Sequence, residues 1–169
     1  MIHQLNKVTT EEAVSKVKSG DRIFIQGAAM TPLKLIDALV NRYKSLEDVE
    51  IIHLHTEGKA PYTEEPYARA FKINSVFVGG NVRSSVRKGN GDYIPIFLSE
   101  IHRLFRRSIL PLDVAFIQVS PPDSHGYCSL GVSVDITIPA IQTAKLVIAQ
   151  VNPKVPRTHG DGIIHLNEL

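Results

Sequence analysis

The residue types best suited to catalysis gather in residues 120–131, which read SPPDSHGYCSLG. A Cys–His pair, Cys128 with His125, could act as a nucleophile and its base, and Asp123 with His125 could relay a proton. Catalytic groups usually converge from distant segments, however, and neighbours in one short turn rarely reach the required geometry. The pattern therefore also fits a rigid, proline-stiffened turn whose polar groups bond to its own backbone.

A second candidate site is the turn QGAAMTP at residues 26–32, which predicts the exit of a strand into a helix. Small residues let a ligand approach the backbone, and the free N–H groups of a helix N-terminus suit an anion. The turn lacks the Gly-Lys-Ser/Thr of a Walker loop and the three glycines of a dinucleotide fingerprint. A tight turn without a ligand is the alternative. The residues concerned are Gln26, Gly27, Ala28, Ala29 and Thr31, with Thr31 as the predicted helix cap.

The most polar exit is predicted at residues 79–91, GGNVRSSVRKGNG, which we expect to form a loop. Its glycines and asparagines favour unusual backbone angles. Arg83, Arg87 and Lys88 could face a carboxylate or a phosphate. A solvated basic loop or a subunit contact is the alternative interpretation of these residues.

Metal binding is not indicated by the histidines or the cysteine. His53 and His55 occupy alternate positions at a predicted strand end and would face the same side, but no third ligand is evident. A single cysteine allows neither an internal disulfide nor a cysteine-based metal cluster. The remaining histidines are scattered through the chain, at His3, His102, His125, His159 and His165.

These candidate residues lie in a chain whose short apolar runs alternate with helical patterns. Thr9 and Glu12 form a capping signal before the first helical stretch. Helices are predicted within residues 9–20, 31–43, 97–105 and 136–144. Strands are predicted at residues 23–25, 49–54, 75–78, 113–119, 145–151 and 163–166.

The strand runs are continuously apolar, which is typical of strands buried on both faces. Together with the intervening helices they predict an α/β fold, an open and mostly parallel sheet with flanking helices. Ligands bind at the carboxyl ends of the strands in such sheets. The strand exits named above are therefore the places where we expect a site.

Composition sets the remaining limits. A chain of 169 residues, 43% of them hydrophobic, suits one domain spanning residues 1–169. A net charge of +2 lacks the basic excess of a non-specific nucleic-acid binder. No apolar run approaches the ~20 residues that cross a bilayer, and the opening residues lack a signal segment. We therefore expect a soluble, cytoplasmic protein with neither nucleic acid nor membrane as a partner.

Four segments of the chain, in order, resemble the N-terminal domain of the acetyl-CoA hydrolase/transferase family, most closely its 4-hydroxybutyrate CoA-transferases. The most specific segment is LDVAFIQVSPPDSHGYCSLGVSVD. The others are TTEEAVSKVKSGDRIFIQGAAMTP, GNVRSSVRKGNGDYIPIFLSEI and AKLVIAQVNPKVPRTHGDGIIHLNEL. The resemblance spans nearly the whole chain and implies the fold expected above, with residues 1–169 as an incomplete N-terminal domain.

The resemblance also implies a reaction, the exchange of CoA between a short-chain acyl-CoA and a carboxylate such as acetate. The acyl group would be 4-hydroxybutyryl, butyryl or acetyl, and the context would be acetate metabolism and butyrate fermentation. CoA would be a substrate, with no permanently bound cofactor. In the family a glutamate forms a glutamyl-CoA thioester, and it lies in a C-terminal domain that we do not find here. No glutamate of this chain inherits that role, including Glu57, Glu64, Glu65 and Glu100.

The resemblance carries over a few site residues. Residues 26–31 match a loop lining the acyl end of the active site, where they would supply shape and backbone N–H donors. Asn81 and Arg83 fall in a loop that could meet the substrate carboxylate. Residues 120–131 would shape the cleft between domains. The chain alone would be inactive, with its own C-terminal domain and a second copy in a homo-oligomer as expected partners.

Two other functions fit the same residues. The chain could be a non-catalytic module of this fold that binds a small phosphorylated ligand or a partner subunit. The complete protein could also be an acyl-CoA hydrolase, in which water rather than a carboxylate resolves the thioester.

Overall fold

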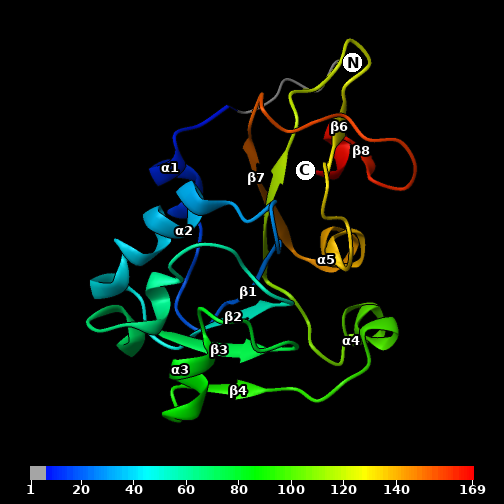
Figure 1. Ribbon diagram of the computed structural model, residues 1–169. Helices are drawn as coiled ribbons and strands as arrows, with labels where there is room; N and C mark the ends of the chain where they lie inside the picture. Colours follow the sequence, from blue (N-terminus) through cyan, green and yellow to red (C-terminus); the bar gives the residue numbers. More distant parts are fainter. Residues whose placement is uncertain (1–6) are drawn as a thin grey trace.

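The computed structural model describes residues 7–169, so His3 lies outside the described residues. A six-stranded sheet forms the centre of the fold, and its strands pair in parallel in the order β4-β3-β2-β1-β5-β7 (Figure 1). The predicted α/β class is confirmed. The strands are β1 Arg22–Ile25, β2 Val49–His53, β3 Phe71–Ser75, β4 Gly91–Tyr93, β5 Val114–Val119 and β7 Leu146–Val151.

Helices cover both faces of the sheet, which explains the continuously apolar strands. On one face Ile23, Ile25 and Phe116 belong to a core that includes side chains of α1 and α2. On the other face Phe24 and Ile117 belong to a core shared with α4 and α5. Figure 1 shows these two helix pairs on opposite sides of the sheet, while α3 contacts the edge strand β4. The helices are α1 Thr10–Val14, α2 Leu33–Val40, α3 Arg83–Arg87, α4 Ile101–Arg106 and α5 Thr137–Thr143.

A second, two-stranded sheet follows the central one. β6 (Tyr127–Ser129) and β8 (Ile163–His165) pair antiparallel. The strand predicted at residues 163–166 is therefore present, but it joins β6 and not the parallel sheet. Short 3₁₀ helices complete the described chain at Tyr43–Ser45, Pro61–Thr63, Tyr67–Arg69, Leu98–Glu100 and Leu166–Glu168.

The strand predicted at residues 75–78 is wrong in position, because β3 spans Phe71–Ser75. β3 lies next to the edge strand and alternates, with Phe71 and Ile73 buried and Lys72 exposed. A search for continuously apolar runs misses such a strand and selects the residues that follow it. Of those, Val76 is buried in a core, whereas Phe77 is 56% exposed.

The prediction that residues 79–91 form a loop is wrong in part. This polar segment contains α3 and ends at the start of β4. β4 is only three residues long and polar, and it completes the edge of the sheet beside β3. The first helix is also shorter than its pattern. It starts as predicted, with the N–H of Glu12 donating to Thr9 Oγ1 over 3.1 Å, but it ends at Val14.

Within the described residues, no helix combines the length and the apolar character that a bilayer crossing requires.

Candidate functional site

The exit of β1 bends away from β5 and packs against the exit of β2. The N–H of Ala28 donates to the carbonyl of His55 over 2.9 Å. A Cβ atom at Gly27 would lie 2.4 Å from that carbonyl oxygen, which is closer than any real contact, so only glycine fits. Ala28 follows with a φ of 49°, an uncommon value for a residue with a side chain. The predicted turn is thus held close to its neighbour by the absence of a side chain.

Gln26 bridges the gap that this bend opens between β1 and β5. Its backbone N–H still donates to Phe116 of β5, over 3.0 Å. The N–H of Gln118, the next donor along β5, is accepted by the side-chain Oε1 of Gln26 over 2.7 Å. The Nε2 of Gln26 donates to the carbonyl of Ser133 over 2.8 Å. Gln26 is fully buried, so its amide continues the ladder of β5 and exposes no surface to a ligand.

Thr31 does not cap α2, contrary to the prediction. The capping position is Pro32, which makes no side-chain cap bond, and the helix begins at Leu33. The hydroxyl of Thr31 instead donates to the carbonyl of Ala28 and accepts the N–H of Glu57, over 2.8 and 3.0 Å. The side chain therefore fastens the β1 exit to the β2 exit. Ala28, half-buried, and Ala29, exposed, are the predicted residues of this turn that face outward.

The N-terminus of α2 is not open to an anion in the way that the sequence suggests. The N–H of Lys34 in its first turn donates to Oε1 of Gln150 over 3.1 Å. Gln150 in turn donates to Oε1 of Gln118 over 2.7 Å, and Asn152 donates to the same oxygen over 3.0 Å. The side chain of Gln150, itself held by Gln118 of β5, thus accepts an N–H that an anion would otherwise bind.

Asn81 meets the β2 exit as well. Its Nδ2 donates to the carbonyl and hydroxyl of Thr56 over 2.9 and 3.2 Å, and to the carbonyl of Gly58 over 3.2 Å. The Thr56 hydroxyl also bonds to the hydroxyl of buried Tyr62 over 3.1 Å. Burial raises the pKa of Tyr62 to about 12. The structure therefore joins the exits of β1, β2 and β3, and Asn81 is the link to the third.

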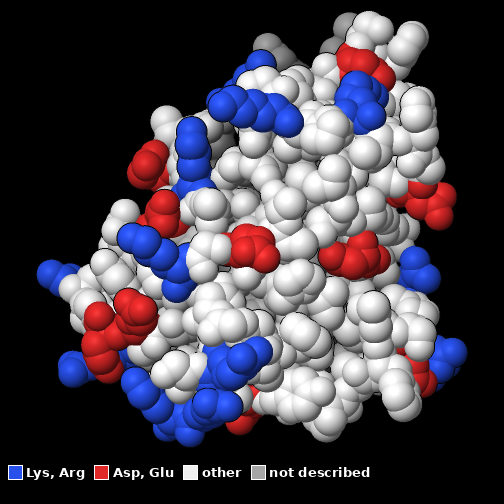
Figure 2. Space-filling model, viewed as in Figure 1, with Lys and Arg blue, Asp and Glu red and all other residues white. Residues whose placement is uncertain are grey.

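Arg83 lies apart from these contacts. It begins α3 and is exposed, as are Arg87 and Lys88. Figure 2 shows basic side chains gathered at the lower left, over α3, with acidic groups elsewhere on the same face. A pocket of about 420 Å³ beside α3 includes Asn81, Ser84 and Lys88 in its lining. The predicted pair is thus split, because Asn81 is a half-buried link between strand exits and Arg83 lies on an exposed helix.

The stretch at residues 120–131 contains the rigid turn that is one of its two interpretations, followed by β6. Oδ1 of Asp123 accepts the backbone N–H groups of His125 and Tyr127, each over 2.9 Å. Its other oxygen, Oδ2, pairs with Arg157 over 2.9 Å. The hydrogen bond from Tyr127, with that from His125 and the charge of Arg157, lowers the pKa of Asp123. The carboxylate is therefore held by its own turn and not poised to relay a proton.

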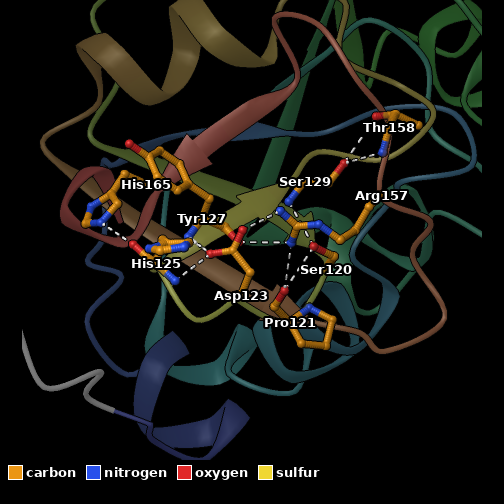
Figure 3. Close-up of polar contacts among 9 residues, drawn as sticks. All are labelled: Ser120, Pro121, Asp123, His125, Tyr127, Ser129, Arg157, Thr158 and His165. Carbon is orange, nitrogen blue, oxygen red and sulfur yellow. Dashed lines mark hydrogen bonds and ion pairs between the residues drawn. The ribbon is translucent and has the colours of Figure 1, made fainter.

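Arg157 and two hydroxyls fasten this turn to the last part of the chain (Figure 3). The guanidinium also donates to the carbonyls of Pro121 and Tyr127 over 3.4 and 3.0 Å. The hydroxyls of Ser129 and Thr158 bond to each other over 3.1 Å. His165 lies within 3.1 Å of the carbonyl of His125. A shallow pocket of about 300 Å³, lined in part by Arg157, lies on this surface.

Cys128 does not have the environment of a nucleophile. It is fully buried within the core shared by α4 and α5, whereas His125 is exposed. Burial raises the pKa of the Cys128 thiol, which disfavours the reactive thiolate. The Cys–His hypothesis is therefore not supported by the geometry.

The two histidines at the end of β2, His53 and His55, lie in different environments. His53 is fully buried beside Tyr62, and neither ring nitrogen finds a hydrogen-bond partner among the described residues. Its burial lowers its pKa to about 4. His55 is half-buried and packs its ring edge-on against Phe77. Residues 7–169 contain no group of three or more metal-ligating side chains.

Sequence reasoning missed Gln118, Gln150 and Arg157, which organise much of this edge. The two glutamines carry a recognisable signal, since each is a polar residue in an apolar strand and opens a Gln-Val-X-Pro sequence. They face each other in register across β5 and β7. Arg157 has no such local signal, because its partners lie about thirty positions earlier in the chain.

Known proteins of similar sequence and structure identify the family. The profile described as acetyl-CoA hydrolase/transferase N-terminal domain matches residues 3–169. The 4-hydroxybutyrate coenzyme A transferase of Clostridium kluyveri is 46% identical over 99% of this chain and 39% of its own length. The succinyl-CoA:acetate/propanoyl-CoA:succinate CoA transferase of Fasciola hepatica is 47% identical over 94% of this chain and 33% of its own length.

Among solved structures, RipA from Yersinia pestis has a TM-score of 0.88 and 30% identity over 96% of this chain and 40% of its own. The chain thus spans 33–40% of the length of these three proteins. The profile match and both curated relatives cover nearly all of the chain. The chain belongs to the acetyl-CoA hydrolase/transferase family and matches the profile of its N-terminal domain.

Proposed function

We propose that this chain is the N-terminal part of a CoA-transferase that moves CoA between a short-chain acyl-CoA and a carboxylate such as acetate. The observation that carries the proposal is the family match over residues 3–169, beside relatives named CoA transferases at 46 and 47% identity. CoA is a substrate in this proposal. The cytoplasm is the proposed compartment, and a homo-oligomer is the proposed assembly.

The turn at residues 26–31 forms one wall of the acyl site in this proposal. Ala28 and Ala29 are its outward residues, and their small side chains leave room for a thioester. The inner side of the turn is fixed by the contacts described above, which involve Gln26, Gly27 and Thr31. The outward backbone stays fixed before substrate arrives, as stabilisation of a developing oxyanion requires.

Arg83 is the proposed contact for the substrate carboxylate. Its guanidinium is exposed on α3, and planar guanidinium groups bind carboxylates through two parallel hydrogen bonds. Asn81 supports this region indirectly, because its amide is committed to Thr56 and Gly58. We therefore assign Asn81 the role of holding the loop, with Arg83 as the binding group.

The chemistry requires a nucleophile outside residues 1–169. A glutamate carboxylate would attack the acyl carbonyl of the thioester, and the C–S bond would break. The CoA thiolate would depart, and an acyl-glutamyl anhydride would be formed. The thiolate would then attack the glutamyl carbonyl, which releases the first carboxylate and forms glutamyl-CoA. The second carboxylate completes the exchange by the same two steps in reverse. Glu57, Glu64 and Glu65 are exposed, and Glu100 pairs with Arg103, so none is sheltered from water as an anhydride needs.

The first test compares this chain with the longer protein of which we propose it is a part. Each is incubated with butyryl-CoA or 4-hydroxybutyryl-CoA and labelled acetate, and labelled acetyl-CoA is measured. We expect exchange by the longer protein only, with a CoA adduct on a glutamate outside residues 1–169. Release of free CoA without labelled acetyl-CoA would identify a hydrolase. Exchange by this chain alone, or a CoA adduct on one of its own carboxylates, would contradict the proposal.

Arg83→Gln in the longer protein tests the carboxylate contact. Loss of a charge-assisted pair should raise the KM for acetate about tenfold, with a smaller change in the KM for the acyl-CoA. Arg87→Gln, which removes the same charge from the same helix, is the matched control and should leave both constants near those of the parent protein. Equal effects of the two substitutions would mean that only the overall charge of α3 matters.

A further inference from the structure

A chain of amide side chains crosses the carboxyl end of the sheet. β5 and β7 end in related sequences, Gln118-Val119-Ser120-Pro121 and Gln150-Val151-Asn152-Pro153. Gln118 and Gln150 are register partners, so their side chains lie on the same face of the sheet. Residues two positions before them, Phe116 and Ile148, belong to the core shared with α1 and α2. The glutamines therefore continue that face to its end, beside the start of α2.

A buried polar side chain in an otherwise apolar strand needs an explanation. Gln118 is 6% exposed, and the other residues of β5 are all buried hydrophobic residues. Burying an amide is unfavourable unless hydrogen bonds compensate, and an aliphatic side chain would fill the space without that requirement. Fully bonded polar groups in a core fix one arrangement of the elements that they join. The bonds of Gln118 therefore indicate which elements are being fixed.

Those bonds connect three strands to one helix. Gln118 Oε1 accepts from Gln150 and Asn152, while its backbone N–H is held by Gln26 at the end of β1. Gln150 has a free side-chain oxygen left, and that oxygen accepts the N–H of Lys34. The amide chain thus starts at one end of the turn at residues 26–31 and closes on the helix just beyond its other end.

We propose that Gln150 is a positioning residue for this turn. It holds the first turn of α2 against the ends of β5 and β7. The turn at residues 26–31 is then fixed at its start by Gln26 and just beyond its end by Lys34. The inference rests on the proposed function in one respect, that residues 26–31 line the reacting thioester. The geometric part of it, the hold of Gln150 on Lys34, stands on the contacts above and does not depend on any activity.

Amide hydrogen exchange of this chain tests the geometric part. Gln150→Leu removes both bonds at nearly constant volume, and Gln150→Glu keeps an oxygen for Lys34 while losing the donor to Gln118. We expect exchange at Lys34 to accelerate about tenfold in Gln150→Leu, with faster exchange in residues 28–31, and recovery at Lys34 in Gln150→Glu. Gln142→Leu, an exposed glutamine on α5, is the control and should change neither. Unchanged exchange at Lys34 in Gln150→Leu would overturn the inference.

Kinetics of the longer protein test the link to the reaction. Gln150→Leu should lower kcat about tenfold with little change in either KM, because a misplaced turn weakens contacts to the transition state more than binding of the substrates. Gln150→Glu should recover most of the loss. Faster exchange at Lys34 with unchanged kcat would overturn the positioning role, whereas an inactive parent protein would contradict the proposed function and leave the exchange result in force.

Discussion

Gly27 is the residue on which the turn after β1 depends most directly. We predict that Gly27→Ala lowers the free energy of unfolding by about 2–3 kcal/mol, because the new Cβ would collide with the His55 carbonyl and the backbone must shift. The collision distance is 2.4 Å, and the obstacle is backbone, which cannot rotate away. Urea unfolding at equilibrium measures the change.

Gly80→Ala provides the matched control for this prediction. A Cβ at Gly80 meets nothing within 4 Å, and Gly80 is not among the residues with positive φ. The same substitution there should change the free energy of unfolding by less than about 0.5 kcal/mol. Similar losses at both glycines would show that backbone freedom, and not the contact with His55, decides the effect.

At the scale of single residues, the sequence predicts local partnerships and misses distant ones. The turn around Asp123 was foreseeable as one of two interpretations, since its acceptors and donors lie within four positions of each other. The role of Gln26 was not, because its partners Gln118 and Ser133 lie 92 and 107 positions away. The local sequence predicts Thr31 as a helix cap, but its hydroxyl accepts the N–H of Glu57 instead. Partners of this kind are set by which strand exits lie side by side in the sheet, and the local sequence does not contain that information.

At the scale of elements, we expect the β6–β8 sheet to depend on Arg157 as well as on its own strand pairing. A two-stranded sheet is marginal by itself, and Arg157 joins the turn before β6 to the segment before β8. We predict that Arg157→Gln accelerates amide exchange in β6 and β8 about tenfold while β1, β2 and β5 keep their protection.

Arg103→Gln is the control for this element. Arg103 is a surface residue on α4, and its guanidinium pairs with the neighbouring Glu100. Its loss should leave exchange in β6 and β8 unchanged, as expected for an exposed ion pair. If Arg157→Gln leaves those two strands as protected as Arg103→Gln does, then backbone pairing alone holds the small sheet.

The strands were predictable where their sequence is continuously apolar. β1, β2, β5 and β7 lie within one residue of their predicted bounds. Burial on both faces explains the apolar runs of β1, β2 and β5. β7 lies at the other edge of the sheet and is only partly buried, but it is apolar along most of its length. β3, β4 and β6 were misplaced or missed. β3 alternates, and β4 and β6 are three residues long, so neither their apolar content nor their period distinguishes them from loops.

At the scale of the whole molecule, the strand order explains where the candidate site lies. β1 is central, with β2 on one side and β5 on the other, so the chain reverses its direction of growth between β1 and β5. Open parallel sheets bind ligands at that point. Here Gln26 bridges the gap, and Met30 lies over Gly131, as the short distance from its sulfur to a Cβ built there indicates. The accessible part of the candidate site therefore does not lie between β1 and β5 but beside Ala28, Ala29 and the exit of β2.

The stability of the whole fold should fall in mild acid because of His53. Its pKa is about 4 in the fold and 6.5 as a reference, so the folded state favours the neutral ring. Because the pKa is lowered in the fold, the free energy of unfolding falls as the pH drops from about 6.5 to about 4, and His53 causes no further loss below pH 4. The difference between the two pKa values corresponds to about 3 kcal/mol. The carboxyls of Asp113 and Asp123, whose pKa values are lowered from 3.8, act only below that window.

Urea unfolding at pH 7 and pH 4.5 should therefore show a loss of about 2–3 kcal/mol in the parent chain. His53→Phe keeps a ring of similar size beside Tyr62 and removes the titrating group, so most of this loss should disappear. His159→Gln, at an exposed position, should keep it. An equal loss in His53→Phe and the parent would place the acid sensitivity elsewhere, whereas its selective disappearance would show that one buried ring, without a partner among residues 7–169, limits the pH range of the fold.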